Sequence, residues 1–139
     1  MWGMKLCRVF KKEEMAEMLS QKPFAGKHQL EPLKSLFLAK ELPFGVIEDF
    51  GVLESEAEIH KNEGDLWFGL EGEVEFTLGG ELVDPWIKEN GGGNEIGGKS
   101  IKGGKVVILK PGDWLWIPPG EPHLHNAKFG RMAIIKIRI

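Results

Sequence analysis

The stretch that decides the fold is residues 112–126, which read GDWLWIPPGEPHLHN. Its apolar segment Trp114–Ile117 predicts a short strand, and the residues PPG at 118–120 predict the turn that ends it. A second strand is predicted to begin at His123. Because side chains two residues apart on a strand point to the same face, His123 and His125 are expected to lie side by side.

Strand patterns continue on both sides of this stretch. Residues 73–78 alternate polar and apolar side chains, and Gly79-Gly80 between them and residues 81–83 predicts a two-residue hairpin turn. Residues 105–109 and 132–139 supply further strands, while 19 glycines and 8 prolines indicate many tight turns. Only residues 11–21 have a convincing helical pattern. We therefore predict an all-β barrel or sandwich with one short N-terminal helix.

Composition excludes several classes of protein. With 139 residues the chain fits one domain, and its net charge of −3 lacks the basic excess of a nucleic-acid binder. No apolar run approaches the roughly 20 residues of a membrane helix, and the N-terminus lacks the apolar core of a signal peptide. The lone cysteine, Cys7, suits a reducing cytoplasm and is predicted to be buried in a first strand.

A second group of polar residues lies at 58–65. Glu58 and His60 share one face of a predicted strand, and Asp65 opens the return strand after a turn, so the three can converge. Together with the two histidines at 123 and 125 they offer oxygen and nitrogen ligands of the kind that suits iron, manganese, nickel or zinc. The alternative is that each is an ordinary solvated or hydrogen-bonded side chain.

Both groups resemble the two motifs of the cupin family. The second motif, G-x5-P-x-G-x2-H-x3-N, matches Gly112, Pro118, Gly120 and His123 in register, and Asn126 comes one residue early. In the first motif, G-x5-H-x-H-x3,4-E-x6-G, Glu58, His60 and Asp65 take the places of the two histidines and the glutamate. Gly72 takes the place of the closing glycine. The resemblance covers residues 45–139.

The resemblance implies a jelly-roll β-barrel over residues 45–139, with residues 1–44 as a strand and helix extension that packs on it. It carries the metal ligands over to Glu58, His60, Asp65 and His123, of which Asp65 could reach the metal through water. It implies a small-molecule metalloenzyme, of dioxygenase, isomerase, epimerase or decarboxylase type. The alternatives are a ligand-binding or sensor cupin without metal, and a structural protein whose tryptophans fill the barrel.

Strand alternation predicts the surroundings of the site, since Trp67 lies two residues after Asp65 and His125 two after His123. Trp67 and Trp116 are the candidate pocket residues, although alternation leaves open which face of its strand Trp116 occupies, and both could simply pack the barrel. His125 is the candidate acid or base, or a substrate contact, and otherwise a hydrogen-bonded barrel residue. The expected partners are a small polar molecule and a second copy of the chain, paired through the apolar residues 134–139 and an N-terminal strand.

The sequence allows two interpretations of the glycine-rich segment 84–104. It could be a solvated hairpin extension or a binding loop. Within it, residues 93–100 fit the phosphate-loop pattern G-x-x-x-x-G-K-S. That loop needs a buried strand before it and a helix after it, and the glycines at 91–92 and 103–104 oppose both. Nucleotide binding is therefore not predicted.

Overall fold

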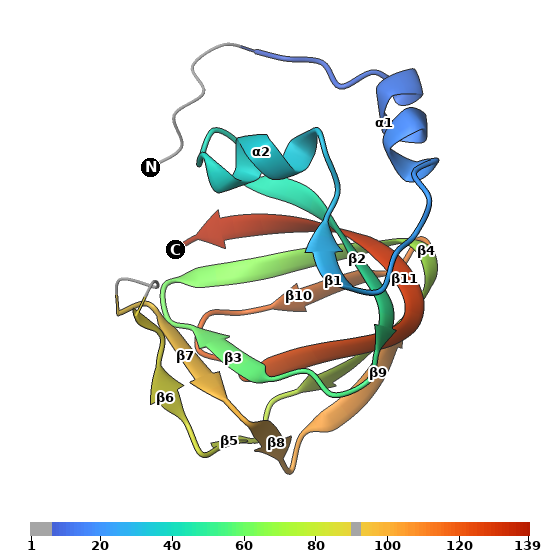
Figure 1. Ribbon diagram of the computed structural model, residues 1–139. Coiled ribbons are helices and arrows are strands. Elements are labelled where there is room, and N and C mark those ends of the chain that lie inside the picture. The colour runs from blue at the N-terminus through green and yellow to red at the C-terminus, as the bar shows by residue number, and fades with distance from the viewer. Residues whose placement is uncertain (1–6, 90–92) are drawn as a thin grey trace.

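The fold is described from a computed structural model, which places residues 7–89 and 93–139. Most of the chain forms strands that wrap into a barrel, with two short helices on one side (Figure 1). In chain order the elements are α1 Lys12–Leu19, β1 Gly26–Gln29, α2 Leu33–Leu38, β2 Phe44–Val52, β3 Ala57–His60, β4 Glu63–Leu78, β5 Glu81–Val83, β6 Trp86–Ile87, β7 Glu95–Gly98, β8 Ser100–Lys102, β9 Lys105–Leu109, β10 Trp114–Ile117 and β11 His123–Arg138. The prediction of an all-β jelly-roll barrel with a short N-terminal helix is confirmed.

Two long strands, β4 and β11, form the spine of the barrel. They pair antiparallel from His123 opposite Leu78 to Arg138 opposite Glu63, with two register shifts along the way. These irregularities let the strands bend from one wall to the other. Gly72 lies at the bend with φ +65°, and a Cβ there would come within 2.2 Å of the Phe129 carbonyl oxygen, so no larger residue fits.

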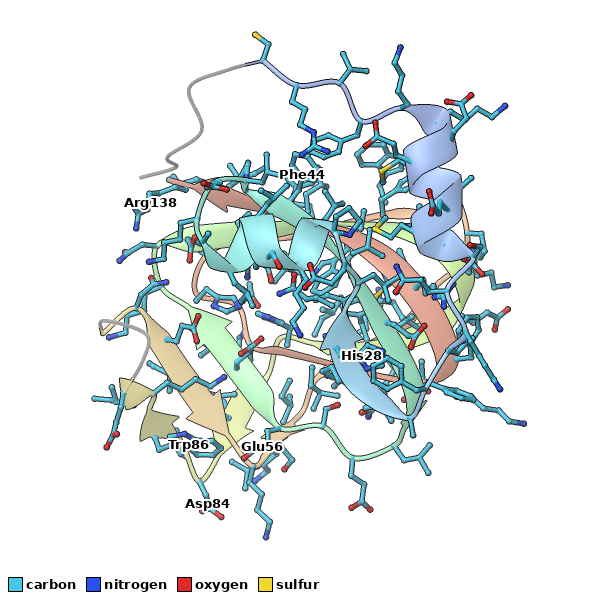
Figure 2. All side chains as sticks on the ribbon, turned by 45° about the horizontal axis from the view of Figure 1, so that its top comes forward. His28, Phe44, Glu56, Asp84, Trp86 and Arg138 are labelled. Carbon is cyan, nitrogen blue, oxygen red and sulfur yellow. The ribbon has the colours of Figure 1, made fainter. Side chains whose placement is uncertain are left out.

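Strand β2 is buried on both faces because two cores meet across it. Ile47 packs against the barrel core, which contains Trp67, Val74, Phe76, Leu109, Ile117, Ala127, Met132 and Ile134. Val46 faces the other way, into a second core under the helices with Met18, Leu30, Leu33 and Leu42. In Figure 2, Phe44 lies beside the helices and Trp86 lies at the opposite end of the molecule. The N-terminal segment also adds β1 to the edge of β2.

Two sequence predictions are corrected here. Residues 81–83 do not form a hairpin with 73–78: β5 pairs with β8, because Lys105 of β9 and His123 of β11 already pair with both sides of Leu78. Cys7 is exposed and lies outside any strand. Residues 1–6 of the expected N-terminal strand lie outside the described part of the chain. None of the helices described is long and apolar enough to cross a membrane.

Candidate metal centre

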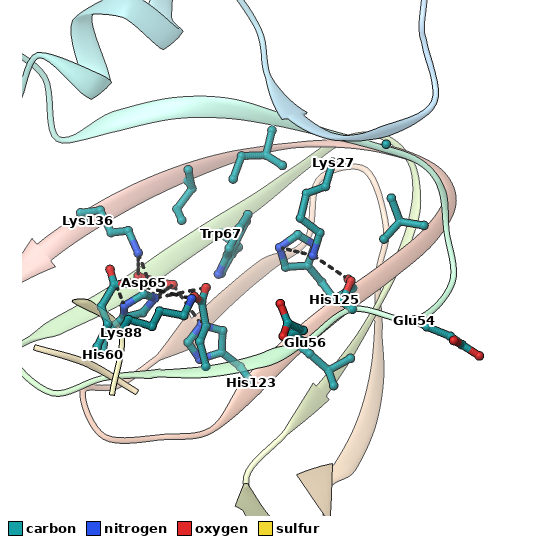
Figure 3. Close-up of a pocket in the computed structure, with 18 of the residues that line it drawn as sticks. Lys27, Glu54, Glu56, His60, Asp65, Trp67, Lys88, His123, His125 and Lys136 are labelled. Carbon is teal, nitrogen blue, oxygen red and sulfur yellow. Dashed lines mark hydrogen bonds and ion pairs between the residues drawn. The ribbon is translucent and has the colours of Figure 1, made fainter. Parts of the chain in front are cut away.

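A cavity of about 700 Å³ opens into the barrel and gathers the predicted site residues. Its walls come from β1, the segment between β2 and β3, and strands β3, β4 and β11 (Figure 3). Segment 84–104 contributes two more lining residues, Lys88 and Glu95. This segment is therefore more than a solvated extension, because part of it forms a wall of the cavity.

Four of the predicted residues converge in this cavity. Glu58 and His60 come from β3, Asp65 from β4, and His123 from β11, where it lies opposite Glu58. One ligand atom each of Glu58, His60 and His123 lies within 4.8 Å of the others. Asp65 Oδ2 joins them at 3.6 Å from His60 Nε2 and 3.5 Å from His123 Nε2. The turn at Gly120 docks on β3 through a hydrogen bond from its N–H to the His60 carbonyl oxygen.

The four candidate ligand atoms fit a cation, because two of them form no hydrogen bond with any residue that the structure describes. Asp65 Oδ2 and His123 Nε2 are buried and accept or donate no hydrogen bond within the described residues. His123 Nδ1 lies 3.0 Å from the Glu121 carbonyl oxygen, which can only accept, so the proton is on Nδ1. The Nε2 lone pair of His123 therefore faces the cluster, as a metal-ligating imidazole requires.

Two lysines supply positive charge at the same cluster. Lys136 Nζ lies 2.7 Å from Asp65 Oδ1 and 3.3 Å from His60 Nε2. Lys88 Nζ lies 2.7 Å from Glu58 Oε2, on the more open side of the cavity. Each ammonium thus balances one carboxylate of the ligand set.

The charges shift the pKa values of the ligands in different directions. Burial alone would lower the pKa of His60, but the carboxylates of Glu58 and Glu95, each 3.5 Å from a ring nitrogen, outweigh it and raise the pKa to about 9. Burial works against the charged form of Glu58, yet His60 and Lys88 hold its pKa well below the ordinary value. Burial lowers the pKa of His123, which favours its neutral, ligating form.

A second polar group lies deeper along the same cavity. His125 Nδ1 lies 2.5 Å from Oδ2 of the buried Asp49, and Lys27 Nζ lies 3.4 Å from His125 Nε2. Trp67 packs edge-on against His125, with ring centroids 5.1 Å apart. Its indole N–H is buried and has no acceptor among the described residues. The predicted residues Trp67 and His125 thus lie together in the cavity.

Comparison with known proteins supports the barrel and leaves the activity open. No protein-family model matches the chain, and no curated protein matches it. Among solved structures, FeII HppE overlaps 97% of this chain and 64% of its own, with 15% identity and a TM-score of 0.51. The Drosophila melanogaster CENP-C cupin domain overlaps 68% and 60%, with 14% identity and a TM-score of 0.47. A cupin protein from Bacteroides fragilis overlaps 85% and 80%, with 16% identity and a TM-score of 0.44.

The chain folds as a cupin. At identities this low the likeness concerns the fold alone. The chain also spans less than two thirds of the HppE and CENP-C chains.

One predicted pocket residue lies outside the cupin cavity. Trp116 is 43% exposed on the outer surface, where its ring covers Gly64. The reason is the alternation of β10: Leu115 and Ile117 pack into the core, which turns Trp114 and Trp116 outward. The expectation for Trp116 is therefore corrected to a surface position.

Sequence reasoning missed three charged residues of this site. Lys136 carries a detectable signal, because Met132 and Ile134 are buried and alternation places Lys136 on the same inward face. Lys88 and Glu95 carry none, since they sit in an irregular glycine-rich segment whose path depends on the pairing of β7 with β3.

Proposed function

We propose that this protein is a small-molecule metalloenzyme that binds one divalent ion through Glu58, His60, Asp65 and His123. The observation that carries the proposal is the convergence of these side chains around two buried ligand atoms that have no other partner. Two carboxylates and two imidazoles suit iron, manganese, nickel or zinc.

The surrounding residues would prepare a small polar substrate for reaction. When bound, the ion would supply Lewis acidity or activate dioxygen, which fits a dioxygenase, isomerase, epimerase or decarboxylase. His125 would hold or move a proton at Nε2, because Asp49 occupies its Nδ1. Trp67 would exclude water from the inner wall. Its free indole N–H would orient an acceptor of the substrate.

The second candidate is a binding or sensor cupin that works without metal. It is supported by Lys136, whose ammonium already lies between Asp65 and His60, and by Lys88 on Glu58. An internal cation at this position could make a metal unnecessary and leave the cavity to a small ligand.

Metal analysis separates the two candidates. We would purify the protein untagged and without chelator, measure bound metal, and titrate the metal-free form with each ion by calorimetry. One ion per chain is expected in the wild type and none in the His60→Ala/His123→Ala variant. His125→Gln is the matched control, because it changes the same cavity without removing a proposed ligand. No binding of any ion by the wild type would overturn the metalloenzyme.

A homodimer is the proposed assembly, in a cytoplasmic setting that the reduced Cys7 would suit. Support for the dimer comes from the outer face of β10 and the end of β11, where Trp114 is 65% exposed and Ile137 is 37% exposed. Two such apolar faces would cover each other across a two-fold axis. Light scattering should give a dimer mass, and Trp114→Lys should convert it to the monomer. A monomeric wild type would contradict the proposal.

A further inference from the structure

Of the three lysines that line the cavity, Lys27 differs in its partners. Lys88 and Lys136 each have a carboxylate oxygen at 2.7 Å. The amine of Lys27 instead contacts two neutral acceptors of one residue, the carbonyl oxygen of His125 at 3.0 Å and its Nε2 at 3.4 Å. No carboxylate of the described chain forms an ion pair with it. Figure 3 shows this amine directed onto the His125 ring.

The hydrogen bonds around His125 leave the lone pair of this amine free. Asp49 Oδ2 accepts from His125 Nδ1, so in the neutral tautomer of His125 the lone pair lies on Nε2 and can accept from Lys27. A neutral Lys27 amine therefore donates both N–H bonds to His125 and keeps its own lone pair for the cavity. The placement is fixed by the sheet, because Lys27 lies directly opposite Asp49 in the pairing of β1 with β2.

The electrostatics increase the fraction of Lys27 that is neutral. Burial lowers the pKa of Lys27, against the attraction of Asp49 and Glu58, and the positive charge of Lys88 lowers it further. These groups and His125 are the charged and titratable neighbours that face it. The neutral form of a lysine amine is a nucleophile toward carbonyl carbon, and a lowered pKa makes more of it available. The residue as a whole stays solvent-accessible, so a small molecule can reach it.

We propose that Lys27 forms an imine with small aldehydes or ketones that carry a hydrogen-bond acceptor beside the carbonyl. The Lys27 nitrogen attacks the carbonyl carbon while the C=O pair moves to oxygen, and the ammonium proton passes to that oxygen to give a carbinolamine. Loss of water then leaves the C=N bond. The indole N–H of Trp67, which packs on the same His125 ring, would hold the neighbouring acceptor.

This activity goes beyond the proposed metalloenzyme and does not depend on it. None of the proposed metal ligands takes part in the imine. The test is therefore run with a chelator present, so that failure to bind metal and failure to form an imine give separate results.

Reductive trapping tests the proposal directly. The protein is incubated with dilute glyoxylate and cyanoborohydride at pH 7, and carboxymethylated lysines are located by peptide mass spectrometry over time. We expect Lys27 to be labelled several-fold faster than Lys61, an exposed lysine after β3. Lys27→Arg, which keeps an N–H donor for His125 but has no nucleophilic amine, should lose the fast phase, whereas Lys61→Arg should keep it. Labelling of Lys27 at or below the rate of Lys61 would overturn the imine.

Trp67→Phe tests the specificity of the same step. This variant keeps the aromatic ring and removes only the N–H. Labelling of Lys27 by glyoxylate should slow several-fold, while labelling by propionaldehyde, which has no second acceptor, should stay unchanged. Equal slowing with both aldehydes, or no slowing with either, would overturn the role assigned to Trp67.

Discussion

Two groups of buried charge lie on opposite faces of β2, and they differ in how their polar atoms are satisfied. On the helix side, Arg131 donates to Glu48, to Glu71 and to the carbonyl oxygens of Leu19 and Gln21. The second oxygen of Glu48 accepts from the Phe24 N–H and contacts the ring of His28. We call this group the Arg131 cluster.

The other group, Glu58, His60, Asp65 and His123, is the cavity cluster. Its carboxylates have lysine partners, yet Asp65 Oδ2, His123 Nε2 and His60 Nδ1 are left without a hydrogen bond in the described structure, and the first two of these face each other. Neither Arg131 nor Glu48 has such an atom. Buried polar atoms are normally satisfied, so a cluster that leaves two of them facing each other is a candidate for binding, while a fully bonded one is structural.

The largest expected effect comes from the Arg131 cluster. Arg131→Met should destabilise the protein by about 3–5 kcal/mol, because it leaves the fully buried Glu48 without its guanidinium partner. Urea denaturation measures the loss. Arg8→Met, which removes the exposed pair with Glu14, is the control and should cost less than about 1 kcal/mol. Similar losses in both variants would show that burial does not set the importance of Arg131.

A smaller loss, reversible by metal, is expected in the cavity cluster. Lys136→Met should cost about 1–3 kcal/mol in the metal-free protein, since it leaves Asp65 Oδ1 without its donor. It also removes an ammonium that competes with a cation for Asp65 and His60. Metal should therefore stabilise Lys136→Met more than it stabilises the wild type, as followed by thermal shift against metal concentration.

Arg131→Met serves as the comparison, because it leaves the four proposed metal ligands unchanged. Metal should raise the thermal stability of Arg131→Met by the same amount as it raises that of the wild type. If metal stabilised the wild type, Lys136→Met and Arg131→Met equally, then Lys136 would not compete with the ion.

The two clusters also differ in how far the sequence predicts them. The strands follow from alternation, and the barrel and the candidate ligands Glu58, His60, Asp65 and His123 follow from motif spacing read with the resemblance to cupins. Alternation and motif distances are local properties of the chain. The Arg131 cluster has no such pattern. Its partners are backbone carbonyls near residue 20 and a glutamate on β2, and they meet only because α1 packs on the outside of the barrel.

Two local sequence patterns gave a wrong or incomplete prediction. The Gly79-Gly80 turn predicts a hairpin, but which strand pairs with β5 depends on which edges of β4 are already occupied. Alternation places Trp114 and Trp116 on one face without saying which face is inside, and only the packing of Ile117 decides it. Periodicity thus predicts elements better than it predicts their partners.

The pH dependence of stability should reveal the cavity cluster. His60 has a pKa of about 9 in the folded protein against 6.5 unfolded, so its contribution is complete below pH 6.5 and is lost as pH rises through about 9. The pKa of Glu58 is lowered from 4.5, so its contribution is complete above pH 4.5 and is lost as pH falls. The pair therefore stabilises the metal-free fold most between pH 4.5 and 6.5.

Urea denaturation at a series of pH values measures this window. Each proton contributes a slope of at most about 1.4 kcal/mol per pH unit. Subtracting the profile of the Glu58→Gln/His60→Gln variant isolates the two groups. A difference profile that is flat from pH 3 to pH 10 would contradict the assigned charges.

The smallest loss of stability is expected for Lys88→Met. Comparing it with Lys136→Met tests how burial alone changes the strength of an ion pair. Lys88 and Lys136 make ion pairs of the same length, 2.7 Å, in the same cavity. Lys88 and Glu58 are each about one-third exposed, whereas Asp65 is 1% exposed. Because water screens the exposed pair, Lys88→Met should cost less than about 1 kcal/mol, below the cost of Lys136→Met. If urea denaturation gave both variants the same loss, then Asp65 would be no more dependent on its lysine than Glu58, and the buried oxygen opposite His123 would lose its significance as a binding position.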